Sequence, residues 1–172
     1  KKAIAELADL VMGFKCYLIS GMDTFQSLTV DELTAVMAEV KKYNRPVLLH
    51  TEDRETVETL TKQEKAKGND WINYYRSRPG KAEILGVQNA IKAAKETGCD
   101  LHIVHIGTGD AAILLKDAAN VFAETCPHYL AFNYTDFERV GGSLKTAPVV
   151  KTAEDSEQLW ECLVNEIGRA HV

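Results

Sequence analysis

The chain has 172 residues, of which 45% are hydrophobic and 26% are charged, a balance typical of a globular protein with one sizeable core. This composition excludes a disordered tail, a collagen-like repeat and a membrane protein. The net charge of −5 argues against a nucleic-acid-binding protein, because phosphate recognition usually requires a basic surface. We therefore expect no nucleic acid and no membrane among its partners.

The cysteines and the N-terminus predict a cytoplasmic location. The N-terminal residues lack the charged and then apolar layout of a signal peptide. Cysteines occur at four scattered positions without CxxC spacing, namely Cys16, Cys99, Cys126 and Cys162. We interpret them as reduced and mostly buried thiols rather than a disulfide framework.

The hydrophobic pattern alternates between short apolar runs and helical periodicity. In the first half of the chain it predicts a helix over 1–10, a strand over 11–20, a helix from Thr29 to before Pro46, a strand over 46–50 and a polar stretch over 51–70. An irregular segment or short helix over 71–79 follows, then a helix ending near Gly98, a strand over 101–106, a short helix over 110–118, a strand over 120–125 and a loop. The last predicted element is an amphipathic helix over 154–167 with Leu159, Leu163 and Ile167 on one side. Strands separated by helices in this order predict a parallel α/β sheet.

The capping box at Thr29 and Glu32 is the clearest helix-start signal in the chain. The apolar run at 46–50 is continuous, which is typical of a parallel strand covered on both faces. It therefore predicts a strand in the interior of the protein.

Three side chains able to bind metal fall in or near the carboxyl ends of predicted strands, where parallel α/β folds collect their chemistry: Lys15, His50 and His105. Each has a plainer interpretation. A strand-end histidine can be an ordinary hydrogen-bonded residue, and a lysine can extend its ammonium group to solvent. However, burial in an apolar strand lowers the pKa of a lysine, and a neutral amine can react with carbon dioxide. The resulting carbamate is an anionic oxygen ligand that can bridge two metal ions.

Five motifs in chain order, GFKCYLIS, PVLLHTED, NYYRSRPGKAE, LHIVHIGTGDAA and ETCPHYL, together resemble the cyclic amidohydrolases. This group of the amidohydrolase superfamily includes the hydantoinases, dihydropyrimidinases, allantoinases and dihydroorotases. The resemblance runs from about residue 11 to residue 160. It implies an α/β fold in which the chain is a segment of a (β/α)₈ TIM barrel, from about its fourth strand to its seventh.

The resemblance also implies a reaction and its cofactors. Lys15 matches the carboxylated lysine that bridges two divalent metal ions, and His50 and His105 match the histidines that hold the more buried ion. Zinc suits such ligands, although Mn, Co or Fe would also fit. The implied reaction is hydrolytic opening of a small cyclic amide, with a water between the cations acidified to hydroxide. Members of the family form dimers and tetramers, so we expect a homo-oligomer.

Three further positions match substrate-facing positions of the family. His128, in the TCPHY segment, is expected to line or support the mouth of the site. Ser20 stands where hydantoinases carry a tyrosine, which favours an allantoinase-like or dihydroorotase-like enzyme. Ala147 stands where the family usually has a side chain that can hydrogen-bond, so only its backbone could contact an amide.

Other polar residues have two interpretations each. His102 lies three residues before His105 on the same predicted strand, so the two should point apart; we expect His102 to pack against a helix. Glu52 and Asp53 could orient His50 or belong to a solvated loop. Arg78 and Glu83 belong to an SRPxxxE pattern that resembles the allantoinase and hydantoinase branch, or they form a structural ion pair.

The family's first-strand His-x-His pair has no counterpart in the chain, and the catalytic aspartate of the eighth strand is also absent. His171 is interpreted as the lead-in to that strand. We therefore expect residues 1–172 to be one incomplete catalytic segment, which by itself binds at most one metal ion and has no turnover. Two alternatives to the enzyme hypothesis remain: a non-catalytic relative with a structural or regulatory role, and an inactive fragment.

Overall fold

The computed structural model describes residues 2–165 of the chain. In chain order the main elements are α1 (Lys2–Leu7), β1 (Phe14–Tyr17), α2 (Val30–Lys41), β2 (Val47–His50), α3 (Arg54–Lys65), α4 (Trp71–Ser77), α5 (Gly80–Thr97), β3 (Leu101–Ile103), α6 (Gly109–Ile113), β4 (Val121–Ala123), α7 (Pro127–Ala131), α8 (Phe137–Val140) and α9 (Ala153–Val164). Short 3-10 turns at Leu114–Asp117, Tyr134–Asp136 and Gly141–Leu144 complete them.

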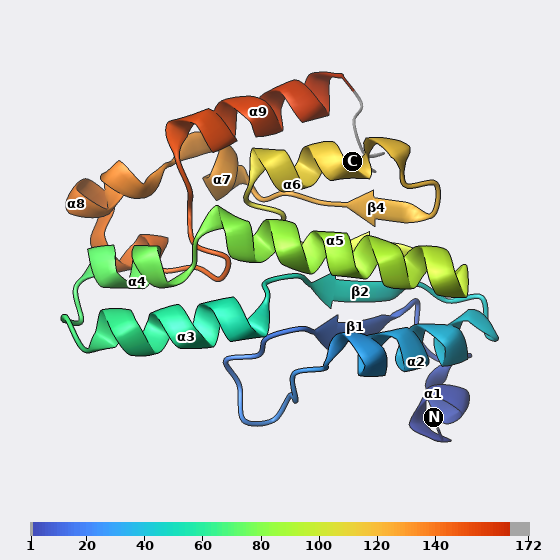
Figure 1. The fold of residues 1–172 in the computed structure, drawn as a ribbon. Coiled ribbons are helices and arrows are strands. Elements are labelled where there is room, and N and C mark those ends of the chain that lie inside the picture. The colour runs from blue at the N-terminus through green and yellow to red at the C-terminus, as the bar shows by residue number, and fades with distance from the viewer. Residues whose placement is uncertain (1, 166–172) are drawn as a thin grey trace.

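The four strands form one parallel sheet in the order β1-β2-β3-β4 (Figure 1). The register aligns Phe14 with Val47, Val47 with Leu101, and Leu101 with Val121. Each strand is followed by helical chain before the next strand begins, which confirms the predicted α/β class. Within the described residues β1 and β4 are the edges of the sheet, as expected for part of a barrel.

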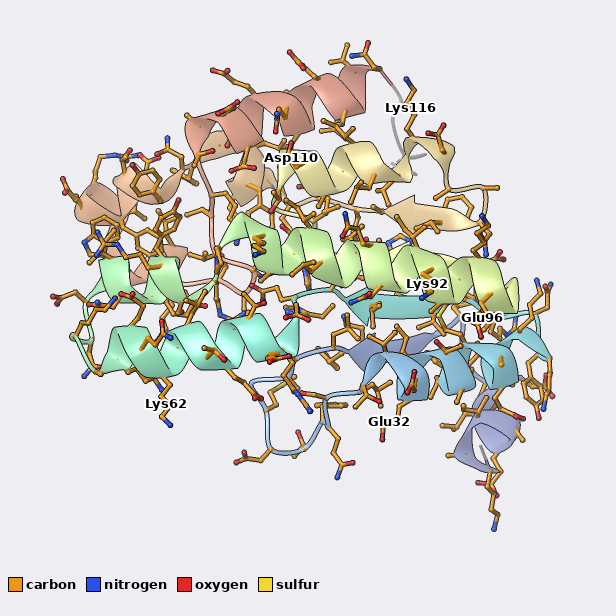
Figure 2. All side chains as sticks on the ribbon, viewed as in Figure 1. Glu32, Lys62, Lys92, Glu96, Asp110 and Lys116 are labelled. Atoms are coloured by element: carbon orange, nitrogen blue, oxygen red, sulfur yellow. The ribbon has the colours of Figure 1, made fainter. Side chains whose placement is uncertain are left out.

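Helices α2, α5 and α6 lie along one face of the sheet, and α9 packs on α6 and α7 (Figure 1). Their apolar residues enclose the core together with Val47, Leu49, Leu101 and Ile103 of the strands, all fully buried. Charged residues such as Lys92 and Glu96 lie on the outer, exposed surface of α5 (Figure 2). Removal of this apolar surface from water supplies the main driving force for folding.

The opposite face of the sheet is only partly covered. Leu48 and His102, whose Cα atoms are partners in the β2–β3 register, are both half-exposed. The continuous apolar run at 46–50 was expected to be buried on both faces, and for Leu48 this expectation is wrong in the described chain. The alternation of buried and half-buried residues along β2 and β3 instead marks a sheet covered by helices on one side.

Local signals placed most helices correctly. Thr29 caps α2, and both hydrogen bonds of the predicted capping box with Glu32 are present. Gly98 ends α5 in the left-handed conformation that favours glycine. Two expectations were incomplete: the polar stretch after His50 contains α3, and the segment after β4 that was expected to be a loop contains α7.

Gly86 allows α5 to approach the chain that leaves β2. A Cβ atom at this position would lie 1.8 Å from the carbonyl oxygen of Thr51. The backbone of α5 therefore packs directly on Thr51 and Glu52, the residues that follow His50. This contact holds in place the chain next to the candidate site. No helix of the described part is long and apolar enough to cross a lipid bilayer.

Ile167 and His171 lie outside the described residues. Of the other two residues expected on the apolar side of the last helix, Leu159 is 1% exposed but Leu163 is 36% exposed, so only Leu159 belongs to the core.

Candidate functional site

The carboxyl ends of β1, β2 and β3 bring the three predicted metal-binding residues to the same part of the molecule. The register pairs Tyr17 with His50, and Lys15 lies two residues before Tyr17 on β1. His105 follows the end of β3, which pairs with β2. Residues that are distant in sequence therefore meet at one edge of the sheet, as the parallel topology requires.

The two histidines face each other. Nδ1 of His50 lies 3.2 Å from Nε2 of His105, and the ring centroids are 4.8 Å apart. The backbone of His105 has φ of 48°, a left-handed conformation that is uncommon for residues other than glycine. Such a conformation costs about 1–3 kcal/mol and persists where the surrounding structure enforces it, which is typical of functional sites.

Glu52 determines which nitrogen of His50 is available. Its Oε2 lies 2.8 Å from Nε2 of His50, and the Glu52 side chain is fully buried. Because a carboxylate only accepts hydrogen bonds, Nε2 of His50 donates to Glu52, and in the neutral imidazole Nδ1 then carries the lone pair. This carboxylate–histidine arrangement is the one that orients metal-binding imidazoles in proteins.

The charges around Glu52 keep it ionised. Burial by itself would raise the pKa of Glu52, but the hydrogen bond with His50 and the positive charges of Arg78 and Lys151 outweigh burial and lower that pKa. Arg78 forms an ion pair with Oε2 of Glu52. The site therefore holds a buried negative charge directly behind His50.

His105 is held in the neutral form that binds metal. Burial, together with the nearby His50 and the Lys15 charge, lowers the pKa of His105 to about 4. Two nitrogens bound to one tetrahedral zinc at about 2.0–2.1 Å would lie about 3.3 Å apart. The observed 3.2 Å between Nδ1 of His50 and Nε2 of His105 therefore fits a shared metal ion.

The amine of Lys15 has a lowered pKa although the residue retains contact with solvent. Burial lowers its pKa to about 8, partly offset by the negative groups of Cys16 and Glu124. Its Nζ lies 4.4 Å from the centroid of the Tyr17 ring. A minor fraction of the amine is therefore neutral near neutral pH, and carbamate formation requires this form. Among residues 2–165, no group of three or more His, Cys, Asp or Glu side chains is arranged to hold a metal ion.

The three substrate-facing candidates occupy different environments. Ser20 hydrogen-bonds within its own loop, where its hydroxyl donates to the Met22 carbonyl and accepts from the Met22 N–H. The His128 ring packs on Tyr129 at 4.1 Å, burial lowers its pKa, and its Nε2 is buried without a partner in the described chain. Within residues 2–165 no hydrogen bond or ring contact joins His128 to His50 or His105.

Ala147 is exposed and follows Thr146, whose carbonyl accepts a hydrogen bond from the Tyr74 hydroxyl. The next residue, Pro148, follows a cis peptide bond, and its carbonyl accepts a hydrogen bond from the Tyr129 hydroxyl at 2.7 Å. Neighbours on both sides thus anchor this segment, while no backbone hydrogen bond of Ala147 itself is formed within the described part. Tyr74 and Tyr129 are not recognisable as anchors from the sequence, because aromatic character alone does not distinguish an anchor from a core residue.

One expectation about the neighbouring polar residues is wrong, and the structure selects between the interpretations of the others. His102 does not pack against a helix: it lies on the open face of the sheet and its Nε2 is 3.1 Å from Oε2 of Glu124. The reason is register, because His102 aligns with Leu48 and so shares the face of Lys15. Asp53 caps α3 through the N–H of Thr56 rather than orienting His50.

The structural ion pair considered for Arg78 and Glu83 is not the one formed. Arg78 pairs with Glu52, whereas the fully buried Glu83 accepts hydrogen bonds from the N–H of Gly107 and the hydroxyl of Thr108. Burial raises the pKa of Glu83. Glu83 therefore holds the turn that follows His105, and Arg78 holds Glu52, which contacts His50. Through these contacts the residues of the SRPxxxE pattern support both His50 and His105.

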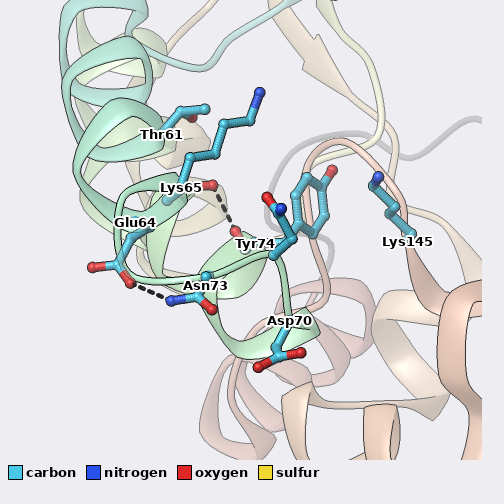
Figure 3. Close-up of a pocket in the computed structure, with 10 residues that line it drawn as sticks. Thr61, Glu64, Lys65, Asp70, Asn73, Tyr74 and Lys145 are labelled. Carbon is cyan, nitrogen blue, oxygen red and sulfur yellow. Dashed lines mark hydrogen bonds between the residues drawn. The ribbon is translucent and has the colours of Figure 1, made fainter.

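A separate cavity of about 330 Å³ lies between the ends of α3 and α4 (Figure 3). In it, Asn73 donates a hydrogen bond to Glu64, and the Tyr74 ring lies beside the Lys145 amine. None of the predicted site residues lines this cavity. Tyr74 lines this cavity, and its hydroxyl also donates a hydrogen bond to the carbonyl of Thr146, the residue before Ala147.

The chain is similar to known proteins over nearly its whole length. It is 38% identical over 159 residues to the allantoinase of Rubrobacter xylanophilus, covering 88% of this chain and 35% of that protein. It is 39% identical over 154 residues to the allantoinase of Bacillus velezensis, covering 86% of this chain and 34% of that protein. No protein-family model matches the chain.

Among solved structures, the L-hydantoinase (dihydropyrimidinase) of Arthrobacter aurescens superposes with a TM-score of 0.90 at 30% identity, covering 95% of this chain and 39% of that one. This likeness confirms the α/β fold predicted for a segment of the barrel. The chain spans little more than a third of the length of the relatives that it matches.

Proposed function

Because the chain belongs to the cyclic amidohydrolase family, we propose that it contributes to the metal-dependent hydrolysis of a small cyclic amide, in which the ring is opened. The observation that carries this proposal is the convergence of Nδ1 of His50 and Nε2 of His105 at 3.2 Å, with Glu52 behind His50. An ordinary pair of buried histidines would not require a buried carboxylate to fix the tautomer that leaves Nδ1 free for a ligand.

In this proposal His50 and His105 would hold one divalent cation, and Lys15 would supply the third ligand. The neutral amine of Lys15 would attack the carbon of carbon dioxide, form an N–C bond and release one proton to solvent, which leaves an anionic carbamate. This carbamate would supply oxygen ligands to divalent cations. The lowered pKa of Lys15 and its electrostatic coupling to His105 support this role. Zinc is the metal that we propose, since it accepts imidazole nitrogen and carbamate oxygen ligands.

The cations, when bound, would acidify a water molecule and polarise the ring carbonyl. The chain's own residues hold and orient the reacting groups. Glu52 prevents rotation of the His50 ring, and Glu83 holds the turn after His105. Ala147 is exposed, and its backbone is suited to hydrogen-bond the amide of a ring, while His128 and Ser20 are proposed to lie near the mouth of the site.

Allantoin is the substrate that we propose first. The relatives of 38% and 39% identity are named allantoinases, and Ser20 departs from the tyrosine expected of a hydantoinase. Hydantoins and dihydroorotate are the other rings to test.

The test measures metal content and ring opening in the 172-residue chain and in the full-length protein of the gene that encodes it. We expect the full-length protein to contain zinc and to open allantoin, and we expect His50→Ala and His105→Ala to lose both properties. His102→Ala is the matched control, because this histidine lies outside the pair, and it should retain both. A full-length protein that neither binds metal nor loses activity in Lys15→Ala would refute the proposal.

A further inference from the structure

Behind the two histidines lies a buried cluster of charged side chains that the proposed chemistry does not use directly. Glu52 and Glu83 are fully buried, Lys151 is 4% exposed, and the Arg78 side chain is 14% exposed. Burying charges costs free energy unless each is paired. The hydrogen bonds and ion pairs of these four side chains therefore indicate their structural role.

One oxygen of Glu52 serves two partners. Oε2 lies 2.8 Å from Nε2 of His50 and also accepts a hydrogen bond from Nη1 of Arg78, whereas Oε1 is buried and has no partner in the described chain. An arginine that only neutralises a carboxylate typically contacts both oxygens. Here Arg78 contacts the oxygen that holds the imidazole, so the position of its guanidinium determines the position of that oxygen.

Arg78 is itself held by the segment that contains Ala147. Its main-chain carbonyl accepts a hydrogen bond from Nζ of Lys151 at 2.6 Å. The ring of Tyr74, whose hydroxyl anchors Thr146, lies 5.8 Å from the guanidinium carbon. A continuous set of contacts therefore leads from the segment around Ala147 through Arg78 and Glu52 to His50.

We infer that Arg78 is a positioning residue: acting through Oε2 of Glu52, it sets the orientation of His50 and couples it to the segment that faces substrate. This inference rests on the proposed function, because it requires His50 to be a metal ligand. It assigns Arg78 no contact with substrate or metal.

The first experiment measures the zinc dissociation constant of the full-length protein by competition with a chromophoric chelator. Loss of groups that orient metal ligands typically costs tenfold to a hundredfold in affinity, and we expect a loss in that range for Arg78→Met. Arg78→Lys should recover part of it, because the contact to one oxygen needs a positive charge rather than a fork of donors. Arg139→Met is the control, since Arg139 pairs with Asp136 on the surface, and it should leave zinc affinity unchanged.

The second experiment asks whether Arg78 acts through Glu52. On a Glu52→Gln background, Arg78→Met should cause no further loss of zinc affinity, because the oxygen that Arg78 positions has lost its charge. This double variant removes both buried charges, so it remains informative if Arg78→Met alone fails to fold. With cobalt in place of zinc, Arg78→Met should also shift the visible absorption bands at full occupancy, which a general loss of stability would not do.

The outcomes separate the inference from the proposed function. If His50→Ala abolishes zinc binding while folded Arg78→Met binds zinc normally, the inference is wrong and the proposed function stands. An additional loss in the double variant beyond Glu52→Gln also overturns the inference. If His50→Ala itself binds zinc with normal affinity, the proposed metal site is wrong.

Discussion

Nδ1 of His50 lies 3.2 Å from Nε2 of His105, although 55 residues separate the two in the chain. The distance suits two ligands of one metal ion, and in the neutral imidazole the contact with Glu52 places the lone pair of His50 on Nδ1, which faces His105. His102, which precedes His105 by three residues, contacts Glu124 and has no hydrogen bond to either of these histidines within the described residues. The proposed metal site therefore requires a particular direction of each imidazole as well as the presence of histidine.

The proposed carbamate on Lys15 can be tested directly. With ¹³C-labelled bicarbonate and zinc, the protein should show a carbamate carbon resonance, since burial lowers the pKa of this amine to about 8. Lys15→Ala should lose the resonance. Lys92→Ala, on the exposed surface of α5, is the control and should retain it (Figure 2). A resonance that persists in Lys15→Ala would show that another amine is modified.

Gly86→Ala should destabilise the protein and weaken the metal site together. The added Cβ would lie 1.8 Å from the carbonyl oxygen of Thr51, so α5 must move away from the chain next to Glu52. Overpacking of this kind typically costs about 1–3 kcal/mol, measurable by urea unfolding. Gly142→Ala is the control, because no atom lies within 4 Å of its added Cβ. Equal stability of the two variants would contradict the close packing of α5.

Thr29→Ala should lower the free energy of unfolding by about 1 kcal/mol, because the Thr29 hydroxyl accepts a hydrogen bond from the N–H of Glu32 at the start of α2. Thr34→Ala is the matched control. The Thr34 hydroxyl donates to the Val30 carbonyl within the helix, where alanine has the higher helix propensity, so little loss is expected. Chemical denaturation of both variants measures the difference.

The same capping box predicts a pH dependence. Hydrogen bonds from the backbone N–H and the hydroxyl of Thr29 lower the pKa of Glu32 below its ordinary value of 4.5. A carboxyl group with a lowered folded-state pKa stabilises the fold above pH 4.5, and this contribution is lost as pH falls through the folded-state pKa. Glu32→Gln should therefore lose less stability than the wild type on acidification. Parallel pH profiles of the two proteins would contradict this assignment.

The open face of the sheet predicts self-association of the isolated chain. Met12 is 86% exposed and lines a shallow cavity of about 340 Å³ together with Leu48 and Phe122. Burial of such a surface against a second copy is favourable. Met12→Lys should therefore lower the average mass in analytical ultracentrifugation, whereas Met22→Lys, in the loop after β1, should not. A monomeric wild-type chain at high concentration would contradict the expected homo-oligomer.

Local patterns in the sequence predicted much of this architecture. The capping box at Thr29, the left-handed end of α5 at Gly98 and the apolar run before His50 each depend on a few neighbouring residues, so no tertiary information was needed. Resemblance to the cyclic amidohydrolases added the order of the motifs, and the likeness to an L-hydantoinase confirms the corresponding fold. Lys15, His50 and His105 were identified as candidates for the same reasons.

Only the tertiary structure decided how these side chains are oriented and supported. Strand alternation could not predict the direction of His105, because β3 ends at Ile103 and the backbone then takes a φ of 48°. The partner of Arg78 is Glu52, 26 residues away, and not the nearby Glu83. Such pairings depend on which elements pack together, since a buried charge takes the partner that the fold brings within reach. The sequence by itself therefore determined which groups are present at the strand ends, and packing determined which of them converge.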